Sequence, residues 1–144
     1  MEKHTKYYSA SPASYGGVYR DISERDSIEF NVSVFNEQGI RKNKLTRGDI
    51  VQKGVRFMVE NGERLHFVVH NRSNEARFFF VETLCLCTHE VLHMVLQLLP
   101  HQRAFLGKMN SASIMTLRNI SECDYNWQTI RSYPVKYAFA TYCG

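Results

Sequence analysis

Two histidines and a glutamate lie together in the stretch HEVLH, at residues 89–93. If this stretch is helical, His89 and His93 lie one turn apart on the same face and can reach a single ion, with Glu90 beside them. A zinc ion held by three protein ligands keeps an open position for water and lowers the pKa of that water to about 7, so that a neighbouring carboxylate can take its proton. The spacing therefore allows a zinc site with His89 and His93 as ligands and Glu90 as the general base, although no cofactor is favoured.

The same five residues resemble the zinc-binding pattern of the zincin metallopeptidases, which implies hydrolase chemistry with these ligand and base roles. The sequence does not select a third ligand, and the candidates from elsewhere in the chain are Glu122, Cys123 and Asp124. Two other interpretations stay open. One is a structural zinc shared with Cys85, Cys87 or Cys123. The other, which we favour, is a helix whose polar strip faces water, made of His89, Glu90, His93 and Gln97.

A second resemblance begins just before this stretch. Thr83 and Leu84, followed by Thr88 and Leu92, are similar to the elongin-binding box of ubiquitin-ligase receptors, with Thr88 where that box usually has a cysteine. The resemblance implies a protein partner.

Positive charge is concentrated in one short run. Residues 41–47 carry four cations and no acid, namely Arg41, Lys42, Lys44 and Arg47, in a chain of net charge +4. Cations contact phosphates, and exposed aromatic faces stack on the bases of single strands. We therefore expect nucleic acid, with RNA favoured, to bind these four residues together with Arg56 and Arg64. A solvated loop is the alternative interpretation of the run.

The length of 144 residues fits one domain, and 44% apolar residues are enough to fill its core. No window approaches the ~18 consecutive apolar residues of a membrane span, and the N-terminus lacks the apolar segment of a secretory signal. Four cysteines fit reduced thiols. We therefore expect a soluble intracellular protein, in the cytoplasm or nucleus, without a membrane partner.

The pattern of apolar residues predicts the elements. Alternation predicts a strand over 27–35, and a run of aromatics predicts another over 76–82. Asn61-Gly62 predicts a hairpin between 55–60 and 63–70, in which a three-residue loop sets Phe57 opposite Leu65 and leaves Arg56 and Arg64 on the other face. A long helix that ends at Pro100 is predicted by a mostly apolar stripe at helical spacing, made of Leu84, Thr88, Val91, Val95 and Leu98.

Beyond Pro100, short helices are expected over 104–109 and 112–118, and strands over 126–132 and 135–142. This order predicts an α+β fold, with a mostly antiparallel sheet of about five to six strands and one long amphipathic helix packed on one face. Residues 1–26 are expected to form a flexible or loosely docked arm, and residues 27–144 a single α+β domain.

The last predicted strand, 135–142, carries a single charge, Lys136. As an edge strand it would pair with a second copy, so a homo-oligomer is expected. The sequence thus favours a non-enzymatic basic domain that binds nucleic acid as a dimer or oligomer. A zinc-dependent hydrolase using HEVLH and a protein-interaction or assembly subunit are the alternatives.

Overall fold

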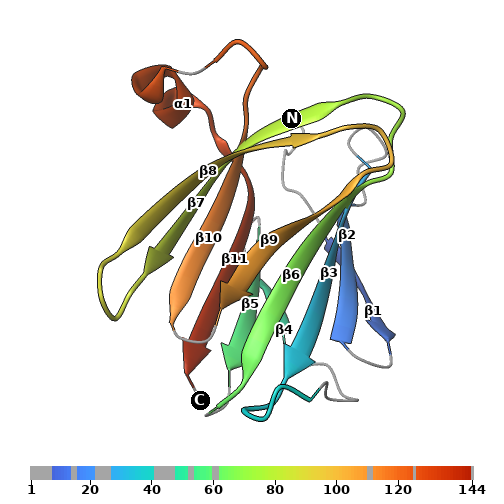
Figure 1. Ribbon diagram of the computed structural model, residues 1–144, viewed down its shortest axis with the longest axis vertical. Coiled ribbons are helices and arrows are strands. Elements are labelled where there is room, and N and C mark those ends of the chain that lie inside the picture. The colour runs from blue at the N-terminus through green and yellow to red at the C-terminus, as the bar shows by residue number, and fades with distance from the viewer. Residues whose placement is uncertain are drawn as a thin grey trace.

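The computed structural model contains two β-sheets that face each other (Figure 1). It describes residues 8–13, 16–21, 27–40, 48–51, 54–59, 62–109, 112–124 and 126–143. Sheet A has five strands, in the order β1 (Tyr8–Ala13), β2 (Gly16–Asp21), β3 (Ile28–Phe35), β6 (Arg64–Asn71) and β9 (Arg103–Met109).

Sheet B has six strands, in the order β4 (Gly48–Val51), β5 (Gly54–Val59), β11 (Val135–Cys143), β10 (Ser113–Asn119), β7 (Arg77–Cys85) and β8 (Val91–Leu98). The pairing of β5 with β11 is parallel, and the other pairings in both sheets are antiparallel. A short helix, α1 (Trp127–Ser132), lies between β10 and β11.

The core fills the space between the two sheets. Along β6, Leu65, Phe67 and Val69 are buried while their neighbours are half-buried, which is the period of two that a strand with one buried face requires. Rings from both sheets meet there: Phe30 of β3 lies with its centroid 4.9 Å from that of Tyr137 and 4.7 Å from that of Phe139, both on β11. The fold is therefore a β-sandwich.

Among the connections that carry the chain from one sheet to the other are β6 into β7 and β8 into β9 (Figure 1). The fully buried side chain of Asn71 joins them. Its amide nitrogen donates to the carbonyl oxygens of Leu98 and Leu99, both at 3.2 Å, and its oxygen accepts from the backbone of Ser73 at 3.0 Å. A buried amide whose hydrogen bonds are made fixes both corners of the sandwich.

The prediction of an α+β fold with a long amphipathic helix is wrong. Residues 84–98 form the end of β7, a turn at 86–90 and the strand β8, and α1, of six residues, is the longest helix in the described part of the chain. The residues at helical spacing come from both faces of β8. Leu98, like Leu96, is buried in the core, whereas Val91 and Val95 are exposed on the opposite face. The helices expected over 104–109 and 112–118 are strands β9 and β10.

Five predicted strands are confirmed, as β3, β5, β6, β7 and β11. The strand expected over 126–132 is instead α1, because the side chain of Asn126 caps a helix by accepting hydrogen bonds from the backbone nitrogens of Gln128 and Thr129. Gly62 does take the left-handed conformation, at φ 83°, but the predicted hairpin is wrong. β5 pairs with β4 and β11, and β6 pairs with β3 and β9.

β11 is not an edge strand, since β5 and β10 flank it. The predicted self-association through residues 135–142 therefore has no free edge to use. The boundary expected near residue 26 stays a prediction; within that segment β1 pairs with β2, and β2 pairs with β3. In the ranges that the structure describes, no helix is long and apolar enough to span a membrane.

Candidate nucleic-acid interface

Three aromatic rings form a row across the outer face of sheet A. They come from three neighbouring strands: Phe35 from β3, His66 from β6 and Phe105 from β9. The alternation that buries Phe67 and Leu65 turns His66 outward. Ring centroids are 4.2 Å apart for Phe35 and His66 and 5.8 Å apart for His66 and Phe105. Phe105 is 53% exposed, so this aromatic row has an open end.

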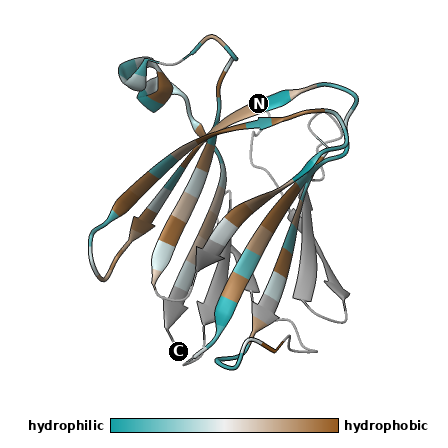
Figure 2. Ribbon diagram, in the orientation of Figure 1, coloured by the Kyte–Doolittle hydropathy of each residue, from teal (hydrophilic) through white to brown (hydrophobic). Residues whose placement is uncertain are grey.

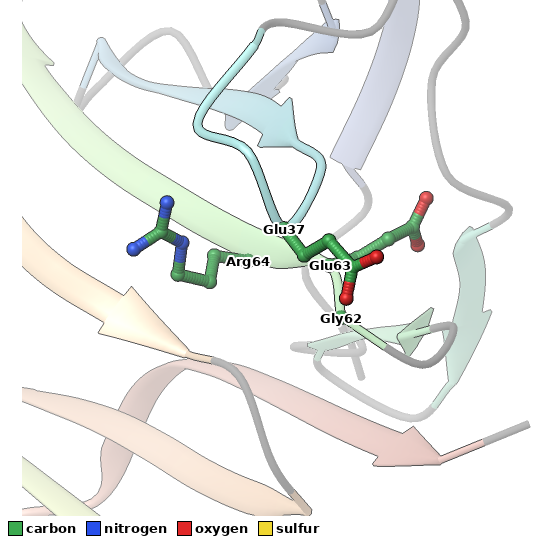
Figure 3. A pocket seen from close by; sticks show the side chains of 4 residues that line it. All are labelled: Glu37, Gly62, Glu63 and Arg64. Atoms are coloured by element: carbon green, nitrogen blue, oxygen red, sulfur yellow. The ribbon is translucent and has the colours of Figure 1, made fainter.

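Arginines flank the aromatic row. Arg64 lies opposite Phe35 in the pairing of β3 with β6, and Arg103 is exposed on β9, two residues before Phe105 and on the same face. Arg64 also lines a depression with Glu37, Gly62 and Glu63 (Figure 3). The figure shows its guanidinium extending away from the carboxylates of Glu37 and Glu63. The charge of Arg64 is thus directed away from the local acids.

Farther along the same face, the carboxylate of Glu29 is engaged by two cationic or titratable groups. Its oxygens lie 3.6 Å from Nδ1 of His70 and 3.5 Å from Nη1 of Arg72, and its side chain is almost buried. A carboxylate that is paired in this way repels an approaching phosphate less than a free one would. The outer face of sheet A therefore exposes Phe105 and Arg103 beside the half-buried Phe35, His66 and Arg64, and this acid is held in an ion pair.

A second aromatic group occupies the outer face of sheet B. The ring of Phe80 on β7 lies 5.1 Å from those of both His93 on β8 and Trp127 on α1, and His93 and Trp127 are 4.7 Å apart. Arg131 lies over the Trp127 ring at 5.5 Å. Beneath these rings, Phe80 packs with the buried side chains of Ile120 and Ile130. We call these three rings the helix-capped cluster, because α1 holds them.

Of the residues predicted to bind nucleic acid, Arg41, Lys42, Lys44 and Arg47 lie outside the described residues. The other two do not share a surface. Arg56 is on β5 in sheet B, opposite Asp49 of β4 and Ala140 of β11, whereas Arg64 is on β6 in sheet A. The predicted common face of Arg56 and Arg64 depended on the hairpin that the structure does not contain.

The zinc prediction depended on a helix that is also absent. His93 lies on β8 and its Nε2 is 2.9 Å from Oε2 of Glu82, while His89 lies in the turn at φ 62°, one residue before Glu90. Among the described residues, no group of three or more histidine, cysteine or acidic side chains could hold a metal ion. The geometric argument for His89 and His93 as ligands and Glu90 as the base therefore no longer holds. The segment similar to an elongin-binding box is part of the same hairpin.

Sequence reasoning missed the aromatic row. One signal was available: His66 sits on the polar face of a strand whose alternate residues are apolar. Nothing in the sequence places Phe35 and Phe105 beside it, because they lie on different strands that meet only through β6.

Comparisons of the chain with protein-family models, with curated proteins and with solved structures found no match. Function is therefore inferred from the geometry and charge of the surface.

Proposed function

We propose that this chain binds single-stranded nucleic acid, with RNA favoured, on the outer face of sheet A. The observation that carries the proposal is the row of Phe35, His66 and Phe105 beside Arg64 and Arg103. Aromatic faces stack on bases without regard to base identity, and arginine contributes both phosphate contacts and stacking.

The size of the row sets the expected footprint. Neighbouring strands lie about 4.8 Å apart, so rings on three consecutive strands span about 10 Å. Sheet platforms of this kind stack roughly two or three bases. Recognition of unpaired RNA commonly uses phenylalanine, histidine and arginine planes in this way, which is why a single strand is favoured over a duplex.

The basic run at 41–47 follows β3 closely in the sequence. Phe35 ends β3, and the turn that follows is closed by Asn36, whose side-chain oxygen accepts hydrogen bonds from the backbone nitrogens of Gln38 and Ile40 at 3.0 and 2.9 Å. Arg41 comes directly after Ile40 in the sequence. We include the cations of the run at 41–47, which lies outside the described residues, as further phosphate contacts.

The test is the affinity of the chain for a fluorescent single-stranded RNA and for DNA of the same sequence, measured by anisotropy. Replacing Phe105 with alanine removes one stacking face, worth about 1–3 kcal/mol, so affinity should fall roughly 5- to 150-fold. Trp127→Ala, which removes a ring from the helix-capped cluster, is the matched control and should leave affinity unchanged.

Absence of binding at low salt would overturn the proposal. An equal loss of affinity in the two variants would also overturn it, because binding would then not depend specifically on the outer face of sheet A. Circular dichroism and thermal melting of both variants establish that each is folded under the assay conditions.

A further inference from the structure

β8 stands at the end of sheet B, and among the strands that the structure describes none pairs with its outer side. Its sequence, VLHMVLQL, carries no lysine, arginine or acid. Large apolar side chains along it and just beyond it are exposed: Val91 by 46%, Leu92 by 66%, Val95 by 47% and Leu99 by 51%. Figure 2 shows this edge of the sheet as predominantly apolar.

The free backbone groups of β8 can be assigned from the hydrogen bonds beside it. The amide of Cys85 donates to the carbonyl oxygen of Glu90, and on the other side of β7 the amide of Ile120 donates to that of Phe78. In an antiparallel ladder the residues of a strand point their N–H and C=O alternately to one side and the other. With Leu84 opposite Val91, the even-numbered residues of β8 bond to β7. The outward-pointing groups belong to Val91, His93, Val95 and Gln97.

The other sheet edges carry features that discourage pairing. β4 is only four residues long, and β1 contains Pro12, which has no N–H to donate. β9 carries Arg103 and Lys108, and a register shift interrupts its pairing with β6. Short length, proline, cations and bulges are the usual protections of an edge strand. β8 pairs with β7 in unbroken register and has none of them.

We propose that β8 pairs with β8 of a second copy of this chain, antiparallel and across a two-fold axis at Val95. The two six-stranded sheets then become one continuous sheet, and the outward groups of Val95 bond to those of Val95 in the copy. This interface does not depend on nucleic-acid binding, since the aromatic row lies on sheet A.

The side chains of β8 favour a second copy of β8 as the partner strand, and they favour the register with Val95 on the axis. With Val95 on the axis, Leu92 faces Leu98, Met94 faces Leu96, Val91 faces Leu99, and the two polar residues, His93 and Gln97, face each other. Because β8 carries no lysine, arginine or acid, pairing with a copy of itself brings no two such charges together. A shift by two residues would place Val91 against Gln97. The strand is therefore complementary to itself, as an interface with two-fold symmetry requires.

The experiment measures mass by light scattering over a range of concentrations. The wild-type chain should give twice the 16.8 kDa of one copy. Val95→Lys places two ammonium groups against each other at the axis and should give the mass of one copy. Phe105→Lys, at an exposed apolar residue on the edge strand of sheet A, should keep the doubled mass. A wild-type mass of one copy, or a doubled mass for Val95→Lys, overturns the proposal.

Hydrogen exchange of single amides locates the interface without any substitution. On going from dilute to concentrated wild-type protein, the amides of the four outward residues of β8 should gain protection, whereas those of Leu92, Met94, Leu96 and Leu98 should already be protected by β7. A dimer whose added protection lies on another strand would show that a different surface is used, and would also overturn the proposal.

Discussion

The two outer faces of the sandwich both carry three aromatic rings and a nearby arginine, yet they differ in what holds the rings. In the helix-capped cluster, Trp127 rests on Phe80 and His93 beneath α1, with Arg131 over its ring. In the aromatic row, each ring comes from a strand, and Phe105 is 53% exposed against 39% for Trp127. The first group attaches a helix to a sheet, and the second leaves ring surface open.

The difference shows that composition alone does not identify a binding surface. Rings that pack on each other and on buried residues such as Ile130 contribute to stability, because their apolar area is removed from water within the fold. Rings at a sheet surface with an open end keep area that a ligand can cover. Measurements of stability and of binding should therefore separate the two faces.

The largest expected difference between variants of the two faces is in the free energy of unfolding. Ile130 is 3% exposed and anchors α1, so Ile130→Ala should lower the free energy of unfolding by about 2–3 kcal/mol, whereas Phe105→Ala at an exposed site should change it by less than about 0.5 kcal/mol. Urea unfolding of both variants gives the two values. A comparable loss in both would mean that the aromatic row is as much a structural element as the helix-capped cluster.

A smaller effect is expected from the arginine of each face. If Arg64 contacts a phosphate, Arg64→Gln should weaken RNA binding and reduce the slope of log affinity against log salt by about 0.7. Arg131→Gln removes a cation of the same charge from sheet B and should leave the slope as it is. Titrations at four or five salt concentrations give the slope for each variant. An unchanged slope for Arg64→Gln would mean that this residue does not contact a phosphate.

The smallest expected effect concerns the attachment of α1. A hydrogen bond from the Tyr133 hydroxyl, and then one from Ser121, lowers the pKa of Asp124, and the same contact with Asp124 raises the pKa of Tyr133. Since the folded aspartate has the lower pKa, its contribution is present above the usual aspartate pKa of about 3.9 and is lost as pH falls through the folded value. Since the folded tyrosine has the higher pKa, its contribution is present below about pH 10 and is lost as pH rises through the folded value.

Fluorescence of Trp127, the single tryptophan of the chain, reports this attachment. The signal should change below about pH 4 and above about pH 10. In Tyr133→Phe the change at high pH should be lost, and the change at low pH should become smaller because Ser121 still donates a hydrogen bond to Asp124. Changes of equal size in the Tyr133→Phe variant would show that other groups control the position of α1.

Alternation was sufficient to predict β3, and the run of aromatics to predict β7, because a buried strand face demands apolar residues at every second position. The same signal was present in β8, where Leu92, Met94, Leu96 and Leu98 alternate with other residues. It was obscured because Val91 and Val95, on the opposite face, are apolar although exposed. The exposed apolar residues of this edge strand produced a spacing that resembles the apolar stripe of a helix. The zinc site was predicted because the segment was taken to be helical.

The sequence by itself determined where the chain is extended at 28–35 and 77–82, the left-handed turn at Gly62, and a net positive charge. Only the tertiary structure decided which strands are neighbours, and so that Phe35, His66 and Phe105 form one row. The reason is physical. Backbone hydrogen bonds between strands are alike for any partner, so the choice of partner depends on how all the apolar faces pack together, which no local stretch of sequence contains.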